Sequence, residues 1–154
     1  MAWYAWYQLE GGEESWQPFL ADQREKLVRE KQPQFTTILD ADTDFKGEMS
    51  SEDMDKVHYR GNLYTDFDSG DLDEVIPQFQ KFLTKLRDGH GFDLEQAQLY
   101  ASGGKGFHCI IPQQCFLPKS VPKGFQYLPA IFKEMVLEIY VDTLDLRVYT
   151  ARRG

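Results

Sequence analysis

The sequence has few of the residues that hold structural metals or disulfides. It contains only two cysteines, Cys109 and Cys115, and three histidines, His58, His90 and His108. Their spacing matches none of the ligand patterns of structural zinc sites. Reduced thiols are also the rule for a chain without a secretory signal. We therefore predict neither a structural zinc ion nor a disulfide.

Long apolar runs and a basic charge balance are missing as well. No stretch approaches the roughly 18 apolar residues of a membrane span, and the first residues, MAWYAWYQLEGG, lack the basic region and cleavage site of a signal peptide. The net charge of −8 argues against a general nucleic-acid coat. Residues 1–74 carry 7 Lys and Arg against 18 Asp and Glu, whereas residues 75–154 carry 10 against 7. A polyanion would therefore bind mainly to residues 75–154, or to an acidic site that contains a metal ion. We expect a soluble intracellular protein with no membrane partner.

What is present is the composition of a folded domain. The 154 residues are 42% hydrophobic and 14% aromatic, enough for one domain with a real core. Hydrophobic periodicity and turn residues predict these elements in chain order: strand 3–9, a helix over 16–31 capped by Ser15, strand 34–39, an acidic solvated loop 40–57, strand 63–67, a helix capped by Asp71, a hairpin of 97–101 and 106–112, helix 127–140 and strand 145–150. This order predicts an α+β fold of mixed α/β layers. The second part of the chain, residues 58–154, has the helix–strand order of a ferredoxin-like or RNA-recognition-like module, and residues 1–57 form a small α/β part.

The stretch GNLYTDFDSGD, residues 61–71, is the first candidate site. Side chains alternate along a strand, so Asp66 and Asp68 point to the same side, about 7 Å apart along it. A divalent cation would relieve their repulsion, and Mg²⁺ is commonly held by one or two carboxylates plus substrate phosphates. Taken alone, the pair also fits a strand end with solvated acids.

The glycine-rich stretch SGGKGFH, which begins at Ser102, is the second candidate site. Glycines such as Gly103 and Gly104 let backbone N–H groups approach an anion, and the turn can form a concave nest for phosphate oxygens. Lys105 adds a positive charge, and His108 adds a hydrogen-bond donor. The spacing is not that of a P-loop, and a hairpin follows instead of a helix. Taken alone, the stretch also fits a glycine-rich hairpin with a solvated lysine.

A third acid, Asp145, lies near the end of a predicted strand, with Asp142 as a competitor for its place. If the strands are neighbours, Asp66, Asp68 and Asp145 make a site for one or two Mg²⁺ or Mn²⁺ ions beside the glycine-rich turn. Two such ions can clamp the attacking and leaving oxygens of a phosphoryl displacement. The residues therefore favour nucleotidyl transfer. A metal-dependent nuclease and a non-catalytic module that binds nucleotides or single strands remain alternatives.

Three stretches in this order, LYTDFDSGD, YASGGKGFHCIIP and LDLRVYTARRG, resemble the archaeo-eukaryotic primase superfamily, which includes the primase-polymerases. Its signatures are an acidic pair on a strand, a serine- and glycine-rich hairpin that ends in histidine, and a third acid on a later strand. The resemblance covers about residues 60–154. It implies a DNA primase or polymerase, a nucleotidyltransferase of DNA replication that synthesises primers or extends strands.

The resemblance also implies roles for the residues of all three motifs. The catalytic acids and metal ligands would be Asp66, Asp68 and Asp145. The phosphates of an NTP or dNTP would be bound by Ser102, Gly103, Gly104, Lys105 and His108. The implied cofactor is Mg²⁺ or Mn²⁺, the implied partner is a single-stranded DNA template, and the implied location is the cytoplasm, at the nucleoid in a cell.

Family cores continue past the third motif, whereas nine residues follow Asp145 here. We therefore expect one catalytic domain over 1–154 that is incomplete at its C-terminal end. A fragment of this kind can lack activity on its own. A helicase or another replication domain in a longer chain is an expected partner.

Overall fold

The computed structural model describes residues 1–10, 16–45, 50–117 and 121–149. Over these residues the chain forms two compact units: the first within residues 1–61 and 121–128, the second within residues 62–117 and 129–149. The boundary falls at Gly61, a few residues after the expected 57, because residues 58–60 pair with a strand of the first unit. Helices combine with antiparallel sheets, so the predicted α+β class is confirmed.

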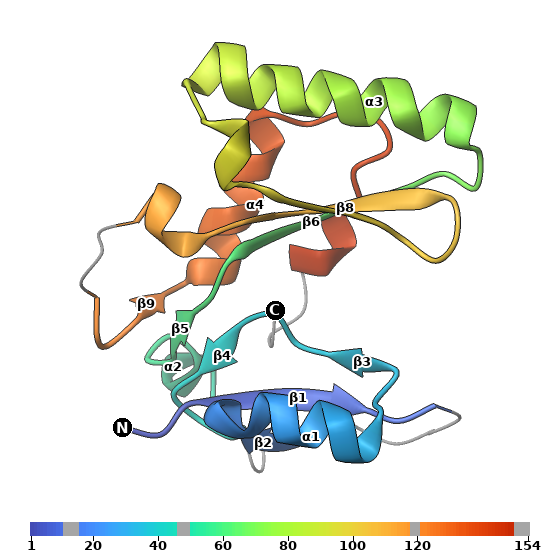
Figure 1. The fold of residues 1–154 in the computed structure, drawn as a ribbon. Coiled ribbons are helices and arrows are strands. Elements are labelled where there is room, and N and C mark those ends of the chain that lie inside the picture. The colour runs from blue at the N-terminus through green and yellow to red at the C-terminus, as the bar shows by residue number, and fades with distance from the viewer. Residues whose placement is uncertain (11–15, 46–49, 118–120, 150–154) are drawn as a thin grey trace. The chain divides into compact units, whose positions relative to one another are not determined.

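The first unit is built on an antiparallel sheet in the order β2-β1-β4-β5-β9, with β3 also paired to β1 (Figure 1). Its strands are β1 (Tyr4–Gln8), β2 (Gln17–Leu20), β3 (Phe35–Thr36), β4 (Asp40–Ala41), β5 (His58–Arg60) and β9 (Phe125–Gln126). Its helices are the 3₁₀ turn η1 (Ala21–Gln23), α1 (Arg24–Lys31) and α2 (Ser51–Met54). The strand expected at 3–9 is confirmed as β1.

The helix predicted over 16–31 begins only at Arg24. Residues Gln17–Leu20 instead form β2, antiparallel to β1. Phe19 is buried on the sheet, with its ring 6.0 Å from that of Tyr7. Pairing with β1 therefore overrides the helical spacing of the apolar residues. The expected cap, Ser15, lies outside the described residues.

The interpretation of residues 34–57 as a strand and a solvated loop is wrong in detail. The strand is only Phe35–Thr36, and β4 and α2 lie within the expected loop. Asp40 is paired with two arginines, at 2.8 Å to Arg24 Nη2 and 3.1 Å to Arg60 Nε. Asp40 is therefore not solvated, because it has two partners that are distant in the sequence.

The second unit contains the three-stranded antiparallel sheet β6-β8-β7. Its elements are β6 (Leu63–Asp68), α3 (Leu72–Thr84), a π-helical turn η2 (Lys85–Gly89), η3 (Leu94–Gln96), β7 (Gln98–Ala101), β8 (Gly106–Ile111), η4 (Gln113–Cys115), α4 (Leu128–Glu138, of which Pro129 onward belongs to this unit) and η5 (Leu146–Tyr149). The predicted hairpin is confirmed as β7 and β8. The predicted cap of α3 is confirmed as well, because Asp71 Oδ1 accepts a hydrogen bond from Asp73 N at 2.9 Å.

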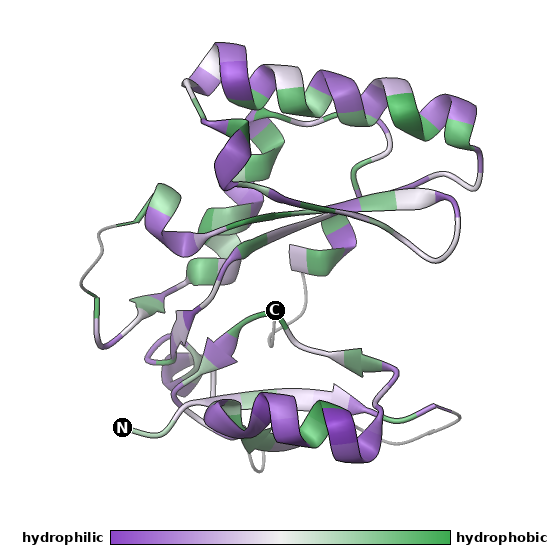
Figure 2. Cartoon of the chain, in the orientation of Figure 1, coloured by the Kyte–Doolittle hydropathy of each residue, from purple (hydrophilic) through white to green (hydrophobic). Residues whose placement is uncertain are grey.

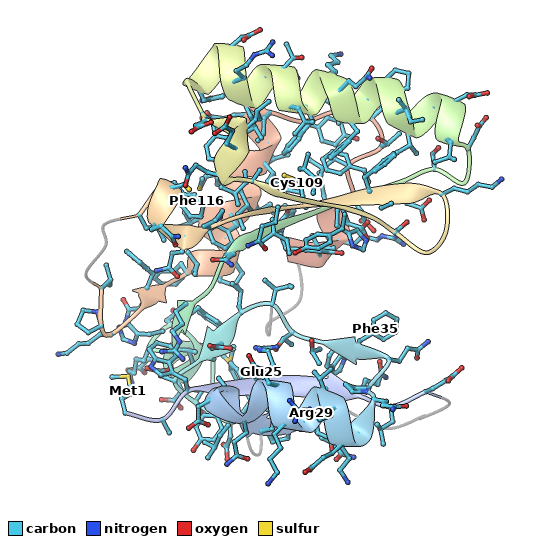
Figure 3. All side chains as sticks on the ribbon, in the orientation of Figure 1. Met1, Glu25, Arg29, Phe35, Cys109 and Phe116 are labelled. Atoms are coloured by element: carbon cyan, nitrogen blue, oxygen red, sulfur yellow. The ribbon has the colours of Figure 1, made fainter. Side chains whose placement is uncertain are left out.

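Helix α3 lies across one face of this sheet (Figure 1). Hydrophobic and hydrophilic residues alternate along it in the manner of an amphipathic helix (Figure 2). Phe79 and Phe82 of α3 contact Phe67 of β6, with ring centroids 4.9 and 4.8 Å apart, and Phe79 also stacks on Phe107 of β8. Cys109 lies between the sheet and α3 (Figure 3) and is fully buried. This aromatic core covers one face of the sheet, and Asp66 and Asp68 lie on the other face.

No helix in the described part of the chain combines the length and the apolarity that crossing a bilayer demands.

Candidate functional site

Strand β6 carries the acidic pair on the face opposite α3. Leu63, Thr65 and Phe67 are buried. On the other face, Asp66 is half-buried and Asp68 is exposed. The period of two along the strand therefore places both carboxylates on one face, as the sequence predicts. The pairing partner of β6 decides what stands beside them.

Strand β8 brings the histidine of the hairpin to the first acid. His108 lies opposite Asp66 in the antiparallel register, and its Nε2 is 3.2 Å from Asp66 Oδ1. The pKa of the Asp66 carboxyl is raised, chiefly because the group is partly buried. The interaction with His108 opposes this rise in the pKa, while the neighbouring acids Asp145 and Asp68 add to it. The acids are thus close enough to repel one another, which is a condition under which a cation stabilises a site.

The third acid meets the first through the backbone. Leu144 forms a β-bridge with Phe67, Asp145 N donates to Asp66 O at 2.9 Å, and Asp68 N donates to the carbonyl of residue 143 at 3.2 Å. The chain therefore lies along the edge of β6 that β8 leaves open. The competing acid, Asp142, is held elsewhere, since its N–H donates to Gln78 Oε1 of α3 at 3.3 Å.

The strand predicted over 145–150 is absent from the described residues. Residues Leu146–Tyr149 form the 3₁₀ helix η5 instead, so the ladder on β6 ends at Asp145. The buried Tyr149 replaces the lost backbone partner, because its hydroxyl donates to the carbonyl of Tyr64 at 2.6 Å. One edge of β6 is thus held at Asp68, Asp66 and Tyr64 in turn. The sequence did not reveal the role of Tyr149.

Arginine 147 is a second residue that the sequence did not single out. Its Nη2 lies 2.7 Å from Asp145 Oδ2 and its Nε 2.9 Å from Asp145 Oδ1, a two-point pairing of guanidinium and carboxylate. The hydrogen bonds from Arg147 lower the pKa of the Asp145 carboxyl. Asp145 is therefore ionised and already paired in this structure.

The glycine-rich hairpin is closed by Ser102 N, which donates to Gly106 O at 3.0 Å. Gly106 lies opposite Asp68, and a Cβ atom there would collide with the carbonyl oxygen of Phe67. This glycine therefore serves the close approach of β8 to β6. A Cβ at Gly103 or Gly104 would meet nothing within 4 Å. Collisions of a Cβ atom therefore give no reason for glycine at those two positions.

Two more hairpin residues complete the predicted set. Ser102 is half-buried at the start of the turn, and Lys105 is exposed just before Gly106. Because Gly106 pairs with Asp68, Lys105 stands at the end of the sheet where the acidic pair ends. The hairpin residues and the acids thus belong to neighbouring strands of one sheet.

The donor set suits a hard divalent cation, although its geometry is not assembled. Among residues that the structure describes, no group of three or more His, Cys, Asp or Glu is arranged to hold a metal ion. Each acid has another partner: Asp66 pairs with His108, Asp68 Oδ1 accepts from Gly70 N at 3.0 Å, and Asp145 pairs with Arg147. Carboxylates are ligands that Mg²⁺ and Mn²⁺ accept. The three carboxylates are thus suitable ligands for such an ion, and their side chains would have to change rotamer to bind it.

A pocket of about 600 Å³ lies in the same unit, away from these residues. Leu63 and Ile111 line this pocket, at the end of β6 and β8 that lies opposite Asp68 and Gly106. Cys115 is among the lining residues. The pocket contains none of the predicted site residues.

Comparisons with known proteins add no relative: no family model, no curated protein and no solved structure matches this chain.

Proposed function

We propose that this chain carries out template-directed nucleotidyl transfer, adding NTPs or dNTPs to a primer or a new strand on single-stranded DNA. The observation that carries the proposal is the hydrogen bond from Asp145 N to Asp66 O, which joins the first and third acidic motifs. The second motif meets the same acid through His108. Three motifs distant in the sequence therefore converge on one strand.

The residues divide the work by their chemistry. Asp66, Asp68 and Asp145 would hold Mg²⁺ or Mn²⁺, which when bound would lower the pKa of the attacking hydroxyl and neutralise phosphate charge. Lys105 and His108 would orient the triphosphate and neutralise charge as pyrophosphate leaves. Gly103 and Gly104 leave their backbone open to phosphate oxygens, since no neighbouring atom crowds them.

The strand order of the second unit supports the RNA-recognition-like interpretation. The bridge at Leu144 extends the sheet to the order Leu144-β6-β8-β7, and chain order is β6-α3-β7-β8-α4-Leu144. This is a split β-α-β arrangement, in which the first and third β-elements are central. Its two central strands carry Asp66 and His108, which lie opposite each other in the register.

The proposal is tested by incorporation of labelled nucleotide on a primed single-stranded template with Mn²⁺. Asp66→Asn, Asp68→Asn and Asp145→Asn are each expected to reduce incorporation by about a hundredfold or more, because each removes charge that the transition state requires. Asp142→Asn is the matched control, since its backbone bonds to α3 instead of β6. Its activity should stay within about twofold of wild type.

Other outcomes would select the alternatives. Synthesis that survives all three aspartate substitutions would refute the assignment of the site. Template degradation without synthesis would favour a metal-dependent nuclease, and metal-dependent nucleotide binding without either reaction would favour a binding module. The location proposed for this activity is the cytoplasm, at the replicating DNA.

A further inference from the structure

We propose that Arg147 is a phosphate-binding residue that exchanges partners, holding Asp145 in the absence of a cation and pairing with the triphosphate once Asp145 binds the metal. The inference rests on the proposed function. It adds a residue to which none of the three motifs assigns a role.

The first observation is that Arg147 occupies both oxygens of the third acid. Its Nε donates to Asp145 Oδ1 at 2.9 Å and its Nη2 to Oδ2 at 2.7 Å, and its backbone N also donates to Oδ1 at 2.8 Å. A cation would compete with this guanidinium for the same lone pairs. Binding of a metal at Asp145 therefore requires Arg147 to move.

The second observation is that the Arg147 side chain lies at the surface, whereas its partner is mostly buried. Its side chain is 89% exposed, whereas that of Asp145 is 22% exposed. An exposed ion pair changes an equilibrium by only about two- to fivefold. The pairing is thus strong enough to be populated and weak enough for a divalent cation to displace.

The third observation is the place where the released guanidinium would remain. The backbone of Asp145 is bonded to Asp66, so a residue two positions further stays beside the acids. Arg147 also interacts electrostatically with Asp66. A guanidinium matches phosphate oxygens in the same two-point geometry that it uses for a carboxylate. The bound triphosphate is therefore the natural second partner.

The test follows the Nε–H resonance of Arg147 by NMR in the full chain, assigned by its loss in Arg147→Lys. Mg²⁺ alone should shift this resonance and speed its exchange with water. A non-hydrolysable NTP added with Mg²⁺ should give a protected resonance at a new position. Backbone amides of Asp66 and Asp145 report metal binding independently, in the same spectra or in a parallel amide experiment.

The chain supplies a matched control in Arg87. Its Nε and Nη2 pair with Asp88 at 2.7 and 3.2 Å, and this exposed pair of adjacent residues has the same chemistry. The Arg87 resonance should not respond to Mg²⁺ or to nucleotide. Arg147→Lys should tighten Mn²⁺ binding without nucleotide about two- to fivefold and weaken nucleotide binding by a similar factor. Arg87→Lys should change neither.

Lysine keeps the positive charge of residue 147. If only that charge mattered, Arg147→Lys would bind Mn²⁺ and nucleotide with wild-type affinity. That result would overturn the proposed exchange of partners. A response at Asp66 and Asp145 with an unchanged Arg147 resonance would also overturn it, while leaving the proposed metal site intact. No response to Mg²⁺ at either acid would overturn the metal site, and the exchange with it.

Discussion

Replacing Tyr149 by phenylalanine removes one hydroxyl and leaves the buried ring in place. That hydroxyl donates to the carbonyl of Tyr64 at 2.6 Å, at the point where the backbone ladder on β6 has already ended. Burial raises the pKa of Tyr149, so the hydroxyl remains a donor well into the alkaline range. The substitution therefore tests one hydrogen bond, with little change in packing.

The cost follows from the partner that is left behind. Loss of a hydrogen bond that leaves a partly buried carbonyl without its donor costs about 1–2 kcal/mol. If η5 holds residues 143–145 on β6, local opening of this segment becomes more frequent by about 5- to 30-fold. The amides of Asp145 and Asp68 should exchange faster by that factor, because both bond across this edge.

Hydrogen exchange measured residue by residue is the assay. Amides of the β6–β8 ladder should exchange at wild-type rates, since the opening is local. Tyr100→Phe is the control: the hydroxyl of Tyr100 is 3.3 Å from Gln98 Oε1, and the side chain is 50% exposed. Wild-type exchange at Asp145 and Asp68 in Tyr149→Phe would refute the idea that the hydroxyl holds the third acid in place.

Two further predictions concern the thiols and the glycines of the second unit. Burial raises the pKa of the Cys109 thiol to about 11. Below that pH it stays protonated, so at pH 8 iodoacetamide should modify Cys115 in the native protein and reach Cys109 only after unfolding; mass spectrometry of the labelled peptides would check this, and equal labelling of both would contradict it. Gly106→Ala should lower the free energy of unfolding by about 1–3 kcal/mol through its collision with β6, whereas Gly103→Ala should be nearly neutral, as urea unfolding would measure. Equal losses in the two variants would contradict the close approach of β8 to β6.

The local part of the candidate site was predictable from the sequence. The period of two along β6 fixes the common face of Asp66 and Asp68, and turn residues fix the hairpin. A turn at 102–105 fixes the register between β7 and β8. It does not fix the pairing of β8 with β6. That pairing puts His108 opposite Asp66, and it became visible only in the folded chain.

The parts that sequence reasoning missed depend on partners distant in the chain. LDLRVYT has the alternation of a strand, yet residues 146–149 turn into η5, because β-propensity yields to tertiary context. The local pattern predicts a helix at Phe19, whereas its contact with Tyr7 comes from pairing between strands. The local pattern predicts a solvated Asp40, whereas its two arginine partners are 16 and 20 positions away. In each case a long-range contact overrode a local pattern.

The edge of β6 combines a fixed backbone with exchangeable side chains. Hydrogen bonds at Asp68, Asp66 and Tyr64 hold the backbone of the segment that carries Asp145 against β6. The carboxylates are held by partners that can leave: a half-buried histidine and a largely exposed arginine. Binding a cation would then require rotation of side chains and no rearrangement of the sheet. Ordering the backbone costs far more free energy than exchanging exposed ion pairs. Because folding already orders the backbone of the proposed site, binding a cation would require only the smaller change.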